Sequence, residues 1–278
     1  MRRWTGTLAN THLDKQGEIL ALGALEAMRD HIKEHLIPMG VEHDPRRPPV
    51  GRVLGAEIRE LDDGTFALEG EGELFEPGDR IPLEIEGRAI PIIEPNPGEM
   101  IIGYDIHFRN ESDQELVADL ANRIGARARY DIKKAADPIA VLSIVAVAVA
   151  SAFLAGFVGK MGSDAWDKLK ELLTRKPQRA KEQLFVFEFV VHNGEQRIVH
   201  RVILTDPTPE LLDLLRTNGL ESLEQQIPMY MRLADSLRIV VHNYDVNGLK
   251  PMFGIRRDGV PVDITNLCDE DQEMPAYT

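Results

Sequence analysis

The sequence predicts an α+β protein with an N-terminal mostly antiparallel β domain, a central apolar helical segment and a C-terminal small α+β domain. The first 125 residues combine one helix-like repeat with runs that alternate apolar and polar residues. A charge-free apolar run then follows over residues 138–158. After residue 182, two Asn-Gly pairs each separate two strand-like runs. We therefore expect domains over 1–125 and 182–268, a linker over 126–181 and a tail over 269–278.

The N-terminal segment contains one amphipathic helix and several strands. Apolar residues recur at helical spacing from Leu20 to Leu36, which predicts a helix over residues 21–36 that ends before Pro38. Residues 50–75 alternate around Asp63-Gly64 and predict a β-hairpin. A further strand is expected over residues 100–108.

A second helix is expected at the end of this domain. Ser112 and Glu115 have the spacing of a capping box, and Leu116, Leu120 and Ile124 follow at helical intervals.

The central segment has two readings. Residues 138–158 are 21 consecutive residues without a charge, which is long enough for a membrane-spanning helix. Basic residues flank the run on both sides, so charge bias sets no orientation. The alternative is a buried helix in a soluble oligomer. Ser163 is expected to cap an amphipathic helix over residues 163–175.

The C-terminal segment predicts two hairpins around helices. Residues 184–191 and 196–205 flank Asn193-Gly194, and residues 237–244 and 250–256 flank Asn247-Gly248. Thr208 followed by Pro209 is typical of a helix N-terminus.

Composition restricts the partners and the compartment. The chain has 46 acidic and 32 basic residues, and its net charge of −14 disfavours a nucleic-acid partner. The single cysteine, Cys268, makes no intramolecular disulfide and no Cys-based zinc site. We expect a cytoplasmic protein or one at the cytoplasmic membrane, with no cofactor and no metal.

Two short motifs carry the sites of interest. The first is Asp14-Lys15-Gln16-Gly17-Glu18 with Leu22-Gly23-Ala24-Leu25, and the second is His43-Asp44 with Pro49-Val50-Gly51. Taken alone, each indicates a turn beside a helix or strand. Together, in this order and spacing, they resemble the phage prohead proteases, which share the herpesvirus assemblin fold. The resemblance covers residues 5 to about 110.

The resemblance implies a serine protease fold in which His43 is the general base. The family serine lies in a strand of the form Ser-(Ile/Phe)-Gly-(Tyr/Phe), and the matching stretch here is Ile101-Ile102-Gly103-Tyr104. Ile101 therefore fills the serine position, and its side chain cannot form an acyl-enzyme. Asp44, Gly103, Tyr104 and His107 are the residues expected to line the same binding site.

The other histidines are weaker candidates. His31 and His35 have the spacing of metal ligands on a helix, but no third ligand accompanies them, so a solvated helix face is the better interpretation. His192, His200 and His242 alternate within C-terminal strands and are expected to be surface or structural residues.

The leading functional hypothesis is a catalytically degenerate prohead-protease-like protein that acts in protein binding or assembly, in a prophage or phage-defence context. Its partner would be another protein or further copies of itself, with membrane contact through residues 138–158 as a second mode. One alternative is an active serine endopeptidase with a different nucleophile. Another is an effector that inserts into a membrane or oligomerises.

Overall fold

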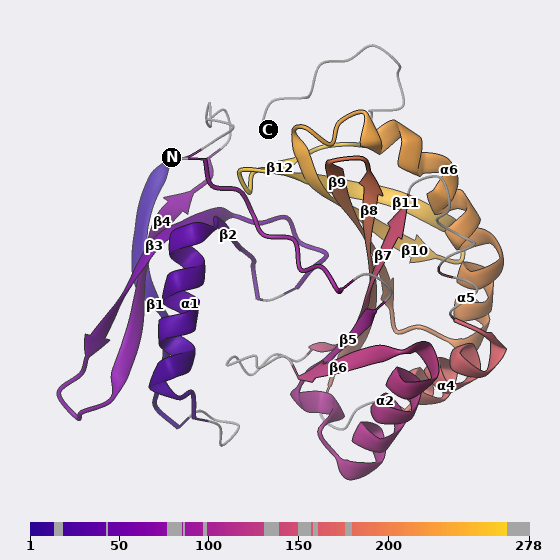
Figure 1. The fold of residues 1–278 in the computed structure, drawn as a ribbon, viewed down its shortest axis with the longest axis horizontal. Helices are drawn as coiled ribbons and strands as arrows, with labels where there is room; N and C mark the ends of the chain where they lie inside the picture. Colours follow the sequence, from indigo (N-terminus) through magenta and orange to yellow (C-terminus); the bar gives the residue numbers. More distant parts are fainter. Residues whose placement is uncertain are drawn as a thin grey trace. The chain divides into compact units, whose positions relative to one another are not determined.

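The chain forms two compact units (Figure 1). The first holds residues 1–91 and the described chain from Ile255 onward, and the second holds the described residues between Ile92 and Gly254. The computed structural model describes residues 1–13, 19–42, 44–76, 85, 87–96, 99–130, 139–149, 157, 161–175 and 180–265.

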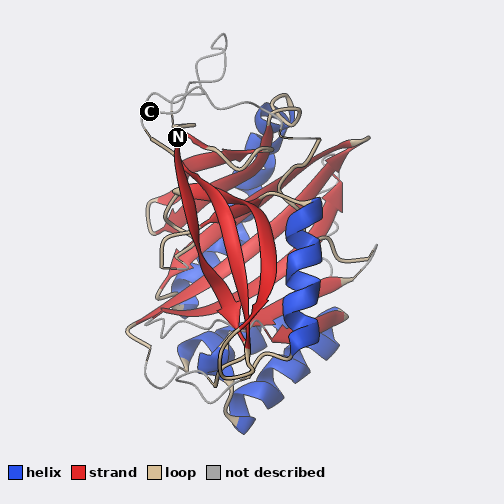
Figure 2. Ribbon diagram, turned by 90° about the vertical axis from the view of Figure 1, so that its left-hand side faces the viewer, coloured by secondary structure: helices blue, strands red, loops and turns tan. Residues whose placement is uncertain are grey.

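The first unit contains a four-stranded antiparallel sheet in the order β1-β4-β3-β2, with one helix packed on one of its faces (Figures 1 and 2). Its elements are β1 (Arg2–Asn10), α1 (Leu22–Glu34), β2 (Ile37–Met39), β3 (Gly51–Glu60) and β4 (Phe66–Leu74). The hairpin turns at Asp63-Gly64, where Gly64 has a φ of +78°. The predicted helix and hairpin are both confirmed.

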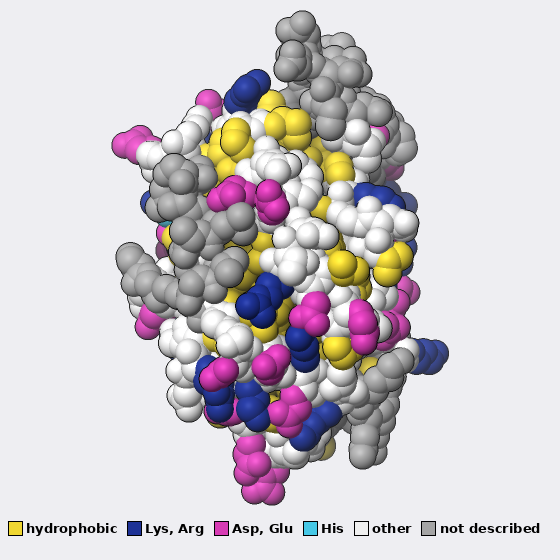
Figure 3. Space-filling model, turned by 90° about the vertical axis from the view of Figure 1, so that its right-hand side faces the viewer, with side chains coloured by type: hydrophobic (Ala, Val, Ile, Leu, Met, Phe, Trp, Pro, Cys, Tyr) yellow, Lys and Arg dark blue, Asp and Glu magenta, His cyan; other side chains and the backbone are white. Residues whose placement is uncertain are grey.

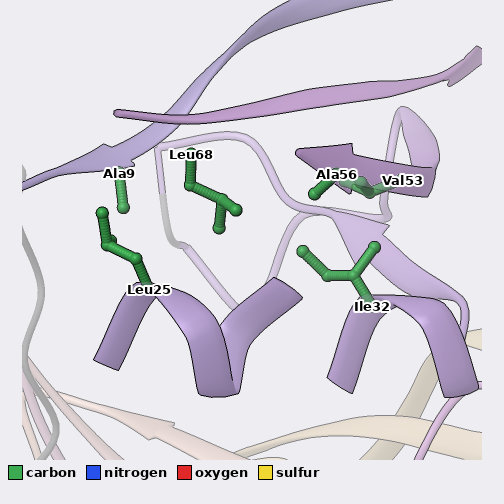
Figure 4. Packing of buried hydrophobic residues seen from close by; sticks show 6 residues of the cluster. All are labelled: Ala9, Leu25, Ile32, Val53, Ala56 and Leu68. Carbon is green, nitrogen blue, oxygen red and sulfur yellow. The ribbon is translucent and has the colours of Figure 1, made fainter. Parts of the chain in front are cut away.

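The core of the first unit lies between α1 and the sheet. Leu25 and Ile32, two turns apart on α1, point toward Ala9, Val53, Ala56 and Leu68 (Figure 4). Leu25 and Leu68 are fully buried. Truncating a leucine in such a position to alanine costs about 2–5 kcal/mol of stability. Burial of this one face of α1 therefore accounts for most of the free energy that holds the helix on the sheet.

Two glycines allow β3 and β4 to pair closely. A Cβ added at Gly51 would lie closer than 3.0 Å to the carbonyl oxygen of Glu73, and one at Gly72 would meet the carbonyl oxygen of Arg52 in the same way. Real Cβ atoms essentially never make such contacts. The Gly51 of the sequence motif is therefore required by backbone packing.

Arg52, the next residue, is fully buried in an ionic network. Its guanidinium donates to Oε2 of Glu73 at 3.0 Å and to the backbone carbonyl of Asp258 at 2.9 Å. Asp258 also accepts from Arg256 at 2.5 Å and from the backbone N–H of Val260 at 3.2 Å. Burial raises the pKa of Asp258 in spite of these donors. The network ties the returning C-terminal chain to β3 and β4.

The second sheet has eight strands in the order β12-β11-β10-β9-β8-β7-β5-β6, and the boundary between the two units falls within β11. Helices lie along one face of this sheet (Figure 1). The elements are β5 (Met100–Tyr104), η1 (Ile106–Phe108), α2 (Glu111–Ile124), β6 (Ala126–Tyr130), β7 (Ile139–Val149), α4 (Ser163–Thr174), β8 (Glu182–Asn193), β9 (Gln196–Thr205), α5 (Pro209–Leu214), η3 (Leu215–Gly219), α6 (Leu220–Met231), β10 (Leu237–Asp245), β11 (Gly248–Arg256) and β12 (Pro261–Val262).

Three strand pairs in this sheet are parallel, and each is joined through helices. These pairs are β5 with β6 through α2, β7 with β8 through α4, and β9 with β10 through α5 and α6. The pairs β5 with β7 and β8 with β9 are antiparallel. Two neighbouring parallel strands need a crossover connection between them, which explains why each parallel pair here is joined through a helix.

The helices bear charges of both signs, which are interspersed on the side of the molecule seen in Figure 3. Lys168 of α4 contacts Asp119 of α2 at 3.6 Å and Glu171 at 2.9 Å. Lys170 of α4 contacts Asp213 of α5 at 2.6 Å. Each of these exposed ion pairs contributes little to stability. The pairs align neighbouring helices, whose apolar faces hold them in place.

The prediction of a helix over residues 138–158 is wrong for Ile139–Val149, which form β7. Residues 138, 150–156 and 158 lie outside the described residues. This strand pairs with β5 on one side and β8 on the other, and most of its described side chains are buried. A central strand with mostly buried side chains is an unbroken apolar run, so periodicity alone does not separate it from a buried helix. Among the described helices, none is both long and apolar enough to cross a bilayer.

The shorter signals gave mixed results. Both Asn-Gly hairpins form, with positive φ at Gly194 and Gly248, and Thr208 caps α5 through a bond from the N–H of Leu211. The capping box at Ser112 is wrong, because Asn110, two residues earlier, caps α2 by accepting from the N–H of Asp113. Ser163 begins α4, and its N-cap is Gly162.

The α+β class is confirmed. The boundaries of the two compact units differ from the expected domain boundaries at residues 125 and 182. The predicted strand over residues 100–108 becomes β5, which pairs with β6 and β7 in the second sheet. The C-terminal hairpins extend that same sheet. Residues 5–110 therefore contain the antiparallel sheet with its helix, together with one strand of another sheet. The expected tail over 269–278 lies outside the described residues.

We predict that Gly51→Ala lowers the free energy of unfolding by about 2–3 kcal/mol, because the added methyl group must push β3 away from β4. The matched control is Gly23→Ala on α1, where an added Cβ meets no atom within 4 Å. That change should raise stability by about 0.5–1 kcal/mol through helix propensity. Urea denaturation of both variants measures the difference, and equal effects would contradict the packing role of Gly51.

Candidate functional site

The best-formed polar site in the second unit lies where β5 ends. Asp105 follows the strand directly, is 1% exposed, and is the N-cap of η1. One carboxylate oxygen accepts from the backbone N–H of His107 at 3.0 Å and faces its ring Nδ1 at 3.1 Å. The other accepts from the backbone N–H of Val141 on β7 at 2.7 Å. Asp105 thus joins the end of β5 to the start of β7 and holds the His107 ring.

This arrangement defines the chemistry open to His107. A carboxylate accepts only, so Nδ1 carries the proton and Nε2 is the nitrogen with a free lone pair when the ring is neutral. The side chain of His107 is 11% exposed. A histidine fixed in one tautomer by a buried carboxylate is the arrangement that general bases use.

Aromatic and cationic side chains surround the same strand ends. Tyr104 and Tyr130 are register partners across the parallel pair β5 and β6, with ring centroids 5.7 Å apart. The guanidinium of Arg109 lies 5.7 Å from the centroid of the Tyr130 ring, within cation–π range. Ligands of open sheets with parallel strands bind at the carboxyl ends of those strands, so this position is favourable for recognition.

Ile101, in the predicted serine position, belongs to the interior of the second sheet. It pairs with Arg127 on β6 and Val145 on β7 and is 1% exposed. Gly103, two residues on, accepts at 3.4 Å from the hydroxyl of Ser143, its register partner on β7. The nearest hydroxyl in register thus donates to a backbone carbonyl.

The second predicted motif lies in the first unit. His43, the expected general base, is outside the described residues. Asp44 forms a two-pronged contact with the guanidinium of Arg46, at 2.9 Å and 2.8 Å. Burial by itself raises the pKa of Asp44, but the hydrogen bonds and charge of Arg46 outweigh it, so the pKa lies below its ordinary value. Asp44 therefore acts as an ionic anchor of its loop.

The structure thus brings Gly103, Tyr104 and His107 together at one strand end and places Asp44 in the other unit. Sequence reasoning missed Asp105, although an Asp two residues before a His at a strand end was a visible signal. In the described part of the chain, no group of three or more His, Cys, Asp or Glu is placed to hold a metal ion. His31 and His35 lie with their ring centroids 4.6 Å apart on α1.

The sequence predicts that His192, His200 and His242 are surface or structural residues. For His200 and His242 only a structural position fits. His200 and His242 are fully buried, whereas His192 is partly exposed and contacts Glu94 at 2.8 Å.

Comparisons with known protein families, with curated proteins and with solved structures find no match.

We predict that Asp105→Ala lowers the free energy of unfolding by about 2–4 kcal/mol, because it leaves the N–H groups of His107 and Val141 without their acceptor. Asp119→Ala is the control, since that carboxylate makes solvent-accessible ion pairs with Arg123 of α2 and Lys168 of α4; its effect should stay within about 0.5 kcal/mol. Thermal or urea unfolding measures both. A loss at Asp105 no larger than the loss at Asp119 would contradict the bridging role.

Proposed function

We propose that this protein acts by protein binding or self-assembly and does not cleave peptides by serine chemistry. The observation that carries the proposal is the position of Ile101. Its side chain has no proton to transfer, and it is buried in the middle of β5 between two neighbouring strands. The likeness to prohead proteases, which work in capsid assembly, then supports an assembly role in a prophage or phage-defence context.

The first sheet supplies a surface suited to assembly. β1 is an edge strand whose hydrogen bonds go to β4 on one side. Its residues Arg2, Arg3, Thr5 and Thr7 are exposed. An exposed edge of nine residues is a template for pairing with an added strand. Thr5 also lines a depression of about 290 Å³ together with Glu57, Glu69 and Glu71, so a partner segment with basic side chains fits this edge.

A second candidate function rests on Asp105 and His107. The carboxylate fixes Nδ1 of the ring and leaves Nε2 as the acceptor, which is the geometry of a general base in a hydrolase. In this interpretation, the nucleophile is a serine hydroxyl of this chain that comes within reach of His107 when a substrate binds. It corresponds to the hypothesis of an active enzyme with a different nucleophile.

The two candidates predict opposite results with a fluorophosphonate probe. The binding function predicts no labelling of the wild-type chain and no cleavage of casein, because a serine nucleophile with its base is missing. Trypsin in the same assay is the positive control. Labelling that disappears in His107→Ala would favour the second candidate, and labelling that disappears in His43→Ala would revive the protease reading.

Self-assembly through β1 has its own test. We expect the weight-average mass in sedimentation velocity to rise above the monomer mass of 31.2 kDa as the concentration increases. Thr5→Lys should return it toward the monomer, because lysine on an edge strand opposes strand addition. The new ammonium would face Glu71, the register partner of Thr5, and would not enter the core. Val246→Lys, in the exposed turn before β11, is the control. A wild-type monomer at every concentration would contradict self-assembly.

A further inference from the structure

Two fully buried histidines form a pair between the second sheet and its helices. His200 on β9 and His242 on β10 lie on neighbouring parallel strands, and Nδ1 of His200 is 3.2 Å from Nε2 of His242. Tyr230 of α6 packs edge-on against both rings, with centroid distances of 5.5 Å and 5.7 Å. All three side chains are at most 1% exposed.

The outer nitrogens of this pair, Nε2 of His200 and Nδ1 of His242, are buried without a hydrogen-bond partner. Two neutral imidazoles share two N–H protons among four nitrogens, and the inner hydrogen bond uses one of them. The second N–H therefore points outward, whichever tautomers are present. The pair is held neutral at the cost of one unsatisfied donor and one unsatisfied acceptor, each of which costs about 1–3 kcal/mol to bury.

Among the described residues, those that face the pair are apolar or aromatic and carry no negative charge. Opposite His200, β8 presents Phe189 and β10 presents Val240. On α6 the facing titratable group is Tyr230, and Tyr244 of β10 lies two residues beyond His242 on the same face. Arg201 lies next to His200 in sequence, points to the opposite face and pairs with Glu188 of β8 at 2.6 Å.

Carboxylates near this layer do not reach the pair. Burial alone lowers the pKa of His200, to about 3, and burial followed by the charge of His200 lowers that of His242 well below its ordinary value. Glu221 and Glu224 of α6 contribute to neither pKa. Burial, and after it the charge of Asp245, raises the pKa of Tyr244, whereas the lowered pKa of His242 follows from burial and His200.

We propose that the His200–His242 pair is an acid-sensitive latch that releases α6 from β9 and β10 when the pair takes up a proton. A proton on either ring places a cation beside Tyr230 and the apolar sheet face, and it is accommodated only when the rings reach water. Separation of α6, which carries Tyr230, is the motion that exposes both rings. This inference goes beyond the proposed function and does not depend on it.

The direction of the pH effect follows from linkage. Each histidine has an ordinary pKa near 6.5 in the open or unfolded state and a lowered one in the closed state. The closed state is therefore fully stable above pH 6.5 and loses stability as the pH falls below it. Each histidine increases the opening constant about tenfold per pH unit in that window, so at pH 5 two histidines give about a thousandfold increase over pH 8.

The test is hydrogen exchange of the full chain at pH 8 and pH 5, corrected for intrinsic exchange rates, in the wild type and in the double variant His200→Phe/His242→Phe. Phenylalanine keeps the ring shape and removes both titrating groups. We expect protection of α6, β9 and β10 in the wild type to fall by up to about a thousandfold at pH 5. The double variant should lose this dependence. His12→Phe, which removes an exposed histidine of the first unit, should behave as the wild type.

Equal pH dependence in the wild type and the double variant would overturn the latch. So would a loss of protection that is as large in β3 and β4 as in α6, because that outcome is global acid unfolding. If the double variant does not fold, His242→Gln replaces one ring by an amide that does not titrate. This single variant should retain about a thirtyfold dependence between pH 8 and pH 5, and an unchanged thousandfold dependence would refute the proposal.

Discussion

The second unit depends on β7, which is paired on both edges and has most of its described side chains buried. The strand pairs with β8 from Ile139 to Val149 and with β5 from Leu142 to Ala146. The backbone of β7 also fixes the positions of residues in the candidate site. Val141 donates to Asp105, and Ser143 opposes Gly103, so the residues after β5 take their positions from a strand that follows them by more than 30 residues. A charge at a buried position of β7 would have no solvent to reach, which explains the absence of Asp, Glu, Lys and Arg from residues 139–149.

Two buried polar clusters, one around Arg52 and one around His200 and His242, differ in how they accommodate a charge. Around Arg52, the guanidinium has a carboxylate, a carbonyl and an aromatic ring as partners. Around His200 and His242, the outer nitrogen of each ring is buried without a hydrogen-bond partner. Paired buried charges fix one arrangement, whereas a buried neutral pair is destabilised when it takes up a proton. The Arg52 network therefore serves the fold through paired charges, and the His200–His242 pair is the group that we propose responds to pH.

Asp105 shows how a structural role and a chemical role coincide in one side chain. As the N-cap of η1 and the partner of Val141, the carboxylate is needed for the fold whether or not His107 reacts. The same carboxylate fixes the tautomer of His107. This dual use means that the geometry alone is compatible with binding as well as with base catalysis, and the burial of Ile101 makes binding the stronger reading.

Local signals in the sequence determined the amphipathic helix α1, the hairpin at Asp63-Gly64, both Asn-Gly hairpins and the cap at Thr208, because each depends on residues close together in the chain. The motif glycine at position 51 was also visible, although its reason is the carbonyl of a strand 22 residues later. Only the tertiary structure decided that residues 139–149 are a strand, that Asp105 meets Val141, and that His200 meets His242. A buried central strand and a buried helix share one apolar composition, and pairs separated by 36 or 42 residues are set by sheet order and not by local spacing.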